Sequence, residues 1–256
     1  MNNPTCFGFI PARYASTRFP GKPLALILGK PMFWHVYNQA IKCPLLSNTY
    51  LATDDERIAQ AAHELNVPCI MTSSDHPSGS DRIFEAAHKL SVQDDAVLLN
   101  IQGDEPALDP NMLTALLEPF RSDQRVQVST LAHPITAPQA INENLVKIAM
   151  DLNNNALYFS RAPIPHVRQA NEHAAPGQEH KFWGHIGLYA FKLKTLKQFI
   201  SMPPSPLELR EGLEQLRFLE HGIPIRVALT NYLSSAVDVP EDIAKVEELL
   251  LTKANP

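Results

Sequence analysis

Residues 49–71 read TYLATDDERIAQAAHELNVPCIM, and this stretch contains two strand patterns separated by one helical pattern. The short apolar run at 49–53 is typical of a buried strand, the run at 55–65 has the apolar spacing of a helix, and 67–71 is again apolar. Two strands joined by a helix of about ten residues form a βα unit, in which the strands are parallel. The stretch therefore predicts an α/β fold.

The same alternation continues on both sides of this stretch. The residues up to 120 add strand patterns at 6–11 and 96–101 and helical patterns at 31–43, 81–90 and 111–120. Beyond residue 120, strand patterns follow one another without long helices, at 126–133, 145–151 and 156–159. A polar, His-rich loop at 166–181 is then followed by a strand at 182–192, a helix at 206–221, a strand at 223–229 and a proline-started helix at 240–251.

These patterns predict a single domain, residues 1–256, with a core at about 1–125 and 201–256 and a smaller strand-rich lobe at about 126–200. Strands that alternate with helices form a mostly parallel sheet with helices on both faces. Such sheets bind ligands beyond the carboxyl ends of their strands. The loops that follow the strands are therefore the expected place of a functional site.

The composition excludes several classes of protein. Hydrophobic residues make up 45% of the chain and charged residues 19%, which is typical of a compact domain rather than a disordered chain. The 22 Lys and Arg against 27 Asp and Glu give a net charge of −5, so neither nucleic acid nor an anionic membrane is an expected partner. Arg13 and Arg18 interrupt the region where a signal peptide needs an apolar run, and the three cysteines contain no CxxC pair. We expect a cytoplasmic protein without a membrane span.

The loop after the first strand, IPARYASTRFPGKP at 10–23, carries three cations among small residues. Cations and backbone amides that leave the end of a strand together are suited to holding a polyphosphate. An ordinary solvated loop is the alternative reading of this segment. It is not a Walker A loop, because each Gly-Lys pair is followed by Pro, and the chain has no GxG of a dinucleotide-binding fingerprint.

Carboxylates follow two further strand patterns. Asp104 lies in QGDEP at 102–106, directly after a buried strand, and Asp238 lies in AVDVP at 236–240, just before a helix. Mg²⁺ accepts one or two protein carboxylates and completes its shell with phosphate oxygens and water. The alternative for both residues is a turn or helix N-cap.

Two more segments contain groups that could contact a base or a sugar. TSSDHPSGSDR at 72–82 brings hydroxyls, a glycine and Arg82 to the start of a helix, although it could be no more than a capped loop. In WGHIGLY at 183–189, period-two alternation places His185, Gly187 and Tyr189 on one side of a strand. A structural role of His185 is the alternative there.

Seven short motifs lie in order along the chain, namely IPARxxSxRxPGKP (10–23), QGDEP (102–106), YFSR (158–161), HxGxY (185–189), SPLE (205–208), EQLR (214–217) and VD (237–238). Together they closely resemble one family, the 3-deoxy-manno-octulosonate (Kdo) cytidylyltransferases, also called CMP-Kdo synthetases. The resemblance covers residues of about 7–248 and implies a Rossmann-like, GT-A-like nucleotidyltransferase sheet with a lobe for dimerisation and sugar binding.

The resemblance implies that the anomeric hydroxyl of Kdo attacks the α-phosphorus of CTP, giving CMP-Kdo and pyrophosphate for lipopolysaccharide biosynthesis. It implies Mg²⁺ as cofactor, with Asp104 and Asp238 as its ligands, and it places Arg18 and Lys22 on the triphosphate; these four are the catalytic candidates. The nucleotide-binding candidates are Pro11, Ala12, Arg13, Lys22, Thr72, Ser73, Ser78, Gly79, Arg82 and Gln102. The sugar-binding candidates are Arg82, Gln102, Arg161, His185, Tyr189, Glu214 and Gln215.

The sequence departs from the family pattern at Ser80, Ala236 and Val239 and in the strand 188–191. These departures leave the phosphate and metal chemistry intact but keep other sugar acids open, namely 8-amino-Kdo or a sialic acid. A nucleotide-binding regulatory protein without turnover is a further alternative. CTP and Kdo are the expected small-molecule partners, and a homodimer is the expected assembly.

Overall fold

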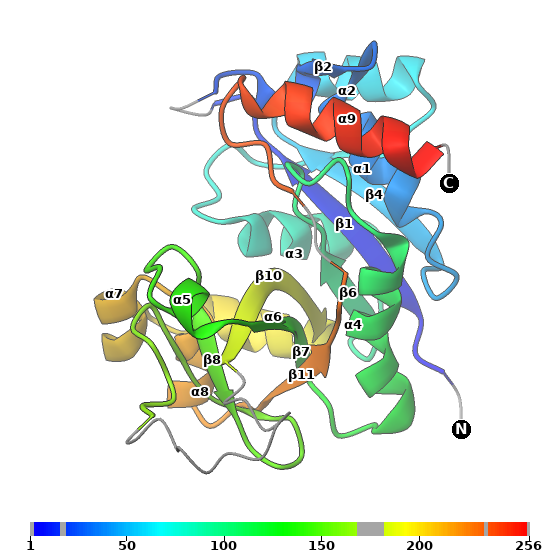
Figure 1. Ribbon diagram of the computed structural model, residues 1–256. Helices are drawn as coiled ribbons and strands as arrows, with labels where there is room; N and C mark the ends of the chain where they lie inside the picture. Colours follow the sequence, from blue (N-terminus) through cyan, green and yellow to red (C-terminus); the bar gives the residue numbers. More distant parts are fainter. Residues whose placement is uncertain (1–2, 16–18, 168–181, 233–234, 255–256) are drawn as a thin grey trace.

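The computed structural model describes residues 3–15, 19–167, 182–232 and 235–254 (Figure 1). Its main sheet has the order β11-β7-β10-β6-β1-β4-β5, with β8 paired to β10 and β9 paired to β8. The strands are β1 (Cys6–Ala12), β4 (Asn48–Thr53), β5 (Cys69–Met71), β6 (Val97–Asn100), β7 (Val128–Ile135), β8 (Lys147–Met150), β9 (Ala156–Ser160), β10 (Phe182–Lys192) and β11 (Ile225–Leu229), besides the small pair β2 (Leu26–Ile27) and β3 (Lys30–Pro31). The helices are η1 (Lys22–Leu24), α1 (Met32–Ala40), α2 (Glu56–Glu64), α3 (Gly79–Lys89), α4 (Pro110–Ser122), α5 (Ala137–Ala140), α6 (Leu193–Ser201), α7 (Pro206–Glu211), α8 (Leu216–Glu220) and α9 (Asp242–Ala254).

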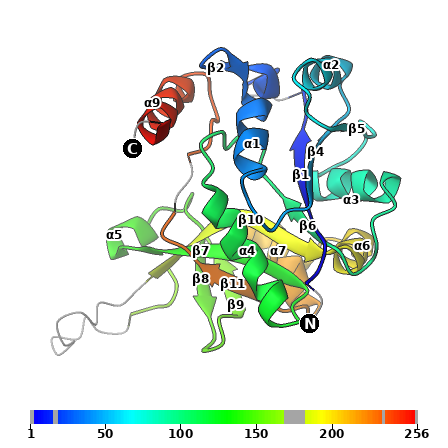
Figure 2. The same ribbon diagram turned by 90° about the vertical axis from the view of Figure 1, so that its right-hand side faces the viewer.

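Helices cover both faces of the sheet, as the sequence predicts. Successive strand residues point to opposite faces, so Ile10 of β1 packs with α1, α2 and α4, while Phe9 packs with α3 and α6. Figure 2 shows α1 and α4 on one side of the sheet and α3 and α6 on the other. The strands β1, β4 and β6 are buried on both faces because each face has its own hydrophobic core.

The direction of the strands decides where loops meet. β1 pairs in parallel with β4 and β6, and β4 pairs in parallel with β5, so the carboxyl ends of these four strands lie along one edge. β10 is antiparallel to β6, with Tyr189 opposite Asn100 at the end of β6. Residues 182–188 of β10 therefore extend beyond that edge, beside the loops that follow the parallel strands.

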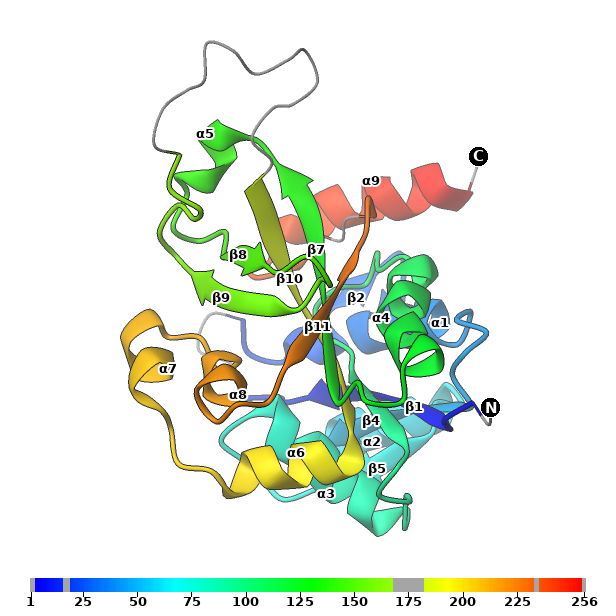
Figure 3. The same ribbon diagram turned by 90° about the horizontal axis from the view of Figure 1, so that it is seen from below.

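The hairpin of β8 and β9 attaches to β10 through a single paired position, Lys147 opposite Gly184. Figure 3 shows this hairpin and α5 on the side of the molecule away from β4 and β5. β7, β10 and β11 belong to the main sheet, so the sheet runs without interruption from the core into this region. The division into a core and a lobe stays a prediction.

One sequence-based prediction of a helix is wrong. The helix expected at 206–221 is two helices, because Gly212 ends α7 in the left-handed conformation with φ of 64°, and the chain turns before α8 begins. Helix α6, directly after β10, is not indicated by the sequence patterns. Leu193, Leu196 and Phe199 of α6 are buried against the sheet.

The segment before α9 returns the chain to the edge where the parallel strands end. Val237 is buried with Ile27 and Met32 under the apolar side of α9, which contacts β2 (Figure 1). In the described part of the chain, no helix is long and apolar enough to cross a membrane.

Candidate active site

The segment after β1 brings Lys22 to the edge of the sheet. Pro11 and Ala12 are the last residues of β1, and Arg13 follows them partly buried. Gly21 adopts a left-handed conformation with φ of 71°, and its N–H donates to the Tyr14 carbonyl at 2.9 Å. This contact closes the loop and places Lys22 at the start of η1. Arg18 lies outside the described residues.

Lys22 joins three segments that are far apart in sequence. Its Nζ donates to Asp104 Oδ2 at 2.7 Å and to the Val237 carbonyl at 2.9 Å, and the N–H of Val237 donates to the Asp104 carbonyl at 2.9 Å. The Lys22 and Asp104 side chains are 17% and 29% exposed, so a ligand can reach both. The predicted catalytic residues Lys22 and Asp104 are therefore brought together, and Asp238, directly after Val237, lies beside them.

The neighbourhood of Asp104 and Asp238 is shaped by backbone contacts. A Cβ on Gly103 would lie 2.8 Å from the Pro11 carbonyl, so only glycine allows the turn after β6 to approach the end of β1 this closely. The N–H groups of Asp238 and Val239 donate to Asp242 Oδ2 at 2.8 and 3.1 Å, which fixes the main chain at Asp238. These bonds from Asp238 and Val239 lower the pKa of Asp242, so it stays ionised.

The segments that meet at this edge carry two carboxylates, Asp104 and Asp238, which are of the chemical kind that Mg²⁺ binds. In the described ranges, no group of three or more His, Cys, Asp or Glu side chains is arranged to hold a metal ion. Asp104 and Asp238 would thus supply two hard oxygen ligands, which is the number that Mg²⁺ commonly takes from a protein when phosphate oxygens and water complete its shell.

The loop between β5 and α3 is anchored through Glu85. Ser73 N–H donates to Glu85 Oε2 at 2.8 Å, and Lys89 and His76 also pair with this carboxylate. Burial raises the pKa of Glu85, but the bonds from Lys89, Ser73 and His76 outweigh it and lower the pKa to about 2. The carboxylate is therefore ionised and holds the loop in place at any ordinary pH.

The same loop places α3 against the end of β1. Ser78 caps α3 by accepting from the Asp81 N–H at 3.2 Å, and a Cβ on Gly79 would lie 3.3 Å from Pro11 Cγ. Thr72 N–H donates to the Thr53 carbonyl at the end of β4 at 2.8 Å. Of the predicted nucleotide-binding residues in this segment, Gly79 thus lies beside Pro11, and Thr72 lies beside the end of β4.

Arg82 is fully buried within this arrangement. Its Nη1 donates to Thr72 Oγ1 at 2.6 Å and its Nη2 lies 3.3 Å from Asp54 Oδ1, while Nε and Nη2 make no hydrogen bond within the described residues. Burial lowers the pKa of Arg82, and the Asp54 charge opposes this. Asp54 was missed in the sequence, although its place directly after a strand was a usable signal.

His185 and Tyr189 contact each other on the part of β10 that extends past β6. His185 Nε2 lies 3.0 Å from the Tyr189 hydroxyl and 2.9 Å from Thr130 Oγ1, and its ring packs edge-on against Phe159 at 5.0 Å. Burial lowers the pKa of His185 to about 3, and burial raises the pKa of Tyr189. Both side chains are therefore neutral, and both can exchange hydrogen bonds with hydroxyl groups.

The two halves of the predicted site adjoin each other. Gln102 Nε2 donates to the Gly187 carbonyl at 3.2 Å, which links the turn carrying Asp104 to β10. The turn between α7 and α8 carries Glu214 and Gln215, and Glu214 is close enough to Tyr189 for its charge to raise the pKa of that phenol further. Gln215 is buried, whereas Glu214 is exposed.

Glu214 and Arg161 complete the sugar side of the predicted site. Surrounding atoms desolvate the Glu214 carboxylate and raise its pKa, and Arg217 opposes this shift. Arg161 follows β9, where its guanidinium donates to the carbonyls of Glu211 and Glu143 at 2.9 and 3.2 Å. Because Phe159 of the same strand packs on His185, Arg161 lies on the β10 side of the site.

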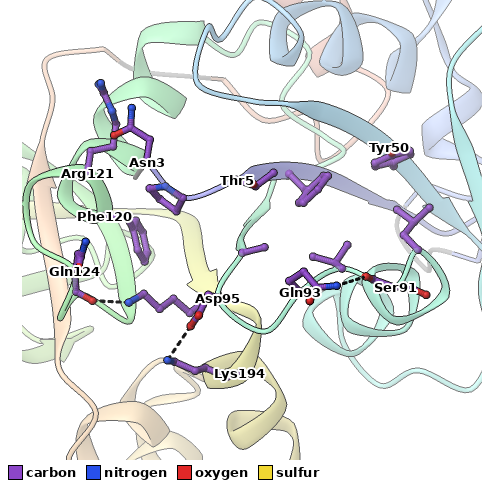
Figure 4. Close-up of a pocket in the computed structure, with 16 residues that line it drawn as sticks. Asn3, Thr5, Tyr50, Ser91, Gln93, Asp95, Phe120, Arg121, Gln124 and Lys194 are labelled. Carbon is purple, nitrogen blue, oxygen red and sulfur yellow. Dashed lines mark hydrogen bonds and ion pairs between the residues drawn. The ribbon is translucent and has the colours of Figure 1, made fainter. Parts of the chain in front are cut away.

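A cavity of about 710 Å³ lies elsewhere, at the amino ends of β1 and β6. Figure 4 shows Thr5, Tyr50 and Phe120 around it, with Asp95 and Lys194 joined by an ion pair of 3.1 Å. None of the predicted site residues lines this cavity. The predicted site lies instead at the carboxyl ends of the parallel strands and along β10.

Comparisons with known proteins agree with the motifs. Residues 7–227 match the profile of a family described as cytidylyltransferase. A 3-deoxy-manno-octulosonate cytidylyltransferase of Nitratidesulfovibrio vulgaris strain Hildenborough is 56% identical, with 96% of each chain covered. The enzyme of the same name from Lawsonia intracellularis is 50% identical, with 97% of this chain and 95% of the relative covered.

Solved structures support the same grouping. A CMP:2-keto-3-deoxy-manno-octonic acid synthetase complexed with CTP is 39% identical and superposes with a TM-score of 0.89 over 97% of this chain and 99% of that one. A 4-diphosphocytidyl-2C-methyl-D-erythritol synthase shares the fold, with a TM-score of 0.63 at 12% identity. Because its curated relatives are 50–56% identical over nearly its whole length, the chain belongs to the cytidylyltransferase family and, within it, to the 3-deoxy-manno-octulosonate cytidylyltransferases.

Proposed function

We propose that this protein transfers CMP from CTP to the anomeric hydroxyl of 3-deoxy-D-manno-octulosonate, releasing pyrophosphate and giving CMP-Kdo for lipopolysaccharide biosynthesis. The observation that carries the proposal is the meeting of Lys22, Asp104 and the Asp238 segment at the end of the parallel strands, in a chain of this family. Gln102 connects this charged centre to β10, where His185 and Tyr189 lie. A nucleotide and a sugar acid bound on the two sides would therefore meet.

The reaction forms one P–O bond and breaks another. The anomeric oxygen attacks the α-phosphorus, its proton is lost, and the bond to pyrophosphate breaks with its electrons going to the leaving oxygen. Negative charge then builds up on pyrophosphate, so cations near that oxygen lower the barrier. We assign this role to Lys22 and, beyond the described residues, to Arg18.

Mg²⁺ is the proposed cofactor, with Asp104 and Asp238 as its ligands. When bound, it would neutralise charge on the phosphate oxygens. Lys22 already contacts Asp104, so the same ammonium would keep this carboxylate turned toward the phosphates. Holding the groups in place before the substrates arrive saves the cost of ordering them during the reaction.

The sugar acid presents a carboxylate and several hydroxyls, and the β10 side offers partners for both. Arg161 is the proposed partner of the carboxylate, and the neutral His185 and Tyr189 are proposed partners of hydroxyls together with Gln102, Glu214 and Gln215. A charged imidazole would attract other anions, so a neutral one favours hydroxyl recognition.

A homodimer through the strand-rich region is also proposed. Among the described residues of that region, Ile141, Leu152 and Leu157 are exposed apolar side chains. Contact with a second copy of the chain would remove such apolar surface from water. A cytoplasmic location stays a prediction, which the use of CTP favours.

The first prediction concerns the reaction itself. The protein mixed with CTP, MgCl₂ and Kdo should release pyrophosphate, a chelator should stop the release, and added MgCl₂ should restore it. A coupled pyrophosphate assay measures this. Absence of pyrophosphate release with every divalent metal would overturn the proposal. Faster release with 8-amino-Kdo or N-acetylneuraminate than with Kdo would show that another sugar acid is the substrate. CTP binding without turnover would indicate a regulatory protein instead.

The two proposed metal ligands can be tested separately. Asp104→Asn and Asp238→Asn should each lower kcat by at least about 100-fold, because a neutral amide binds Mg²⁺ poorly and leaves developing charge uncompensated. Asp109→Asn is the matched control, since Asp109 caps α4 five residues after Asp104 and asparagine caps a helix equally well. Near-normal turnover of either metal-site variant, with an unchanged melting curve, would contradict its role.

Stability should depend on pH through His185. Between pH 6.5 and about 3, the unfolded chain protonates this histidine while the folded chain keeps it neutral, so its contribution to stability falls as the pH falls. His185→Gln should flatten the pH dependence of the unfolding free energy by up to about 1.4 kcal/mol per pH unit in that window. Urea unfolding from pH 4 to 7 measures this, with the exposed His63→Gln as control. Equal slopes for His185→Gln and wild type would exclude a buried neutral histidine.

The proposed dimer gives a further expectation. Sedimentation velocity at micromolar concentration should show a species with twice the mass of one chain, and Leu157→Glu should shift it toward the monomer, because a charge in an apolar contact is poorly solvated. A wild-type protein that sediments as a monomer would contradict the proposal.

A further inference from the structure

Two charged side chains hold the main chain of Arg161 from opposite sides. The N–H of Arg161 donates to Glu211 Oε2 at 2.9 Å, and the Arg161 carbonyl accepts from Lys147 Nζ. Glu211 is the last residue of α7, and Lys147 begins β8. Two elements that are separate in sequence, α7 and β8, therefore fix both main-chain hydrogen-bonding groups of Arg161.

The Arg161 side chain is held by the same neighbourhood. Its Nε donates to the Glu211 carbonyl at 2.9 Å and its Nη1 to the Glu143 carbonyl at 3.2 Å. Within the described residues, Nη2 donates to no protein acceptor. The guanidinium thus has its orientation set by carbonyl groups, while one edge still has an N–H group to offer to a ligand.

Glu211 and Lys147 each make further hydrogen bonds that fix their own side chains. Glu211 Oε1 also accepts from Ser160 Oγ at 2.7 Å. Burial raises the pKa of Glu211, but the hydrogen bonds that it accepts, from Arg161 and Ser160 among others, outweigh burial and lower the pKa. Lys147 is fully buried, and its other hydrogen bond goes to the Asn142 carbonyl at 2.9 Å. Burying an ammonium group is costly because it loses its hydration, even when carbonyl groups accept its hydrogen bonds. Lys147 therefore contributes more to the geometry of this region than to the stability of the fold.

The held residue lies next to the sugar side of the site. Lys147 is paired with Ser160 on one side and with Gly184 on the other, and the N–H of the next residue, His185, donates to the Val146 carbonyl at 2.8 Å. On the far side of Glu211, the left-handed Gly212 leads directly into the turn with Glu214 and Gln215. Lys147 and Glu211 therefore connect the segments that carry every proposed sugar ligand outside the nucleotide loops.

We propose that Glu211 and Lys147 are positioning residues for the sugar acid, which hold Arg161 so that its guanidinium meets the substrate carboxylate. This inference rests on the proposed function, because it takes Arg161 as a ligand of the sugar acid. The two residues do not touch the substrate. They act on the sugar through Arg161 and leave the CTP side, with Lys22 and Asp104, unaffected.

The test is the effect on the two Michaelis constants, measured separately. Glu211→Ala should raise KM for Kdo by about 10- to 100-fold, because a displaced binding group loses its alignment, and KM for CTP should stay within about twofold. Glu211→Gln should give an intermediate value, since its amide oxygen can replace one of the two carboxylate acceptors. Lys147→Met, which removes the other holding group, should shift the same constant in the same direction.

A matched control separates positioning from stability. Asp151 holds the far end of the same hairpin by accepting from the N–H groups of Asn153 and Asn155 at 2.8 and 2.7 Å. Asp151→Ala should lower the melting temperature without changing KM for Kdo. If the Glu211 and Lys147 variants lower stability but leave KM for Kdo as Asp151→Ala does, the two residues are only structural and the inference is wrong. Glu211→Gln keeps the test decisive if Glu211→Ala does not fold.

Arg161→Ala distinguishes failure of the inference from failure of the proposed function. If this variant raises KM for Kdo and Glu211→Ala does not, the inference alone fails. If Arg161→Ala leaves KM for Kdo unchanged, the role of Arg161 in the proposed function is wrong and the inference fails with it. If the wild-type protein does not use Kdo at all, the pyrophosphate assay overturns both the proposed function and this inference.

Discussion

The contact of the Lys22 ammonium with Asp104 and with the Val237 carbonyl is the constraint on which the rest of the site depends. It joins the segment after β1, the turn after β6 and the segment before α9. An ammonium that is only 17% exposed needs all its partners, so it keeps these segments together. Val237 is itself buried under α9, and the packing of that helix thereby determines where Asp238 lies.

The direction of β10 gives the site its second half. A parallel strand would end level with β6, but the antiparallel β10 continues past Asn100 and brings His185 and Gly187 beside the turn that carries Asp104. The proposed nucleotide side therefore consists of loops, whereas the proposed sugar side includes a strand. Groups on a strand are held by the sheet's own hydrogen bonds, which suits a site that must present neutral side chains in fixed orientations.

Charged contacts add to the apolar packing of the region around β8 and β9, where Ile148, Ala156 and Phe159 belong to a large hydrophobic core. The apolar cluster of Ile135, Ala140 and Phe182 is small, and the buried polar side chains nearby include Lys147 and Glu208. Glu208 pairs with Arg217, and this pair joins α7 to α8. Buried ion pairs add little net stability but are highly directional, so the Glu208–Arg217 pair mainly fixes the position of α7 relative to α8.

The sequence by itself determined the α/β class, the helix-covered sheet and the family, because strand and helix periodicities are local and the motifs around Lys22 and Asp104 are contiguous. It did not indicate helix α6, the break at Gly212, or the contacts of Asp54, Lys147 and Glu211. Only the tertiary structure decided these, for a physical reason. The role of a buried charge depends on partners that lie far away in sequence. From the sequence alone, Lys147 cannot be distinguished from a surface lysine, because only the fold places the Arg161 carbonyl beside its ammonium.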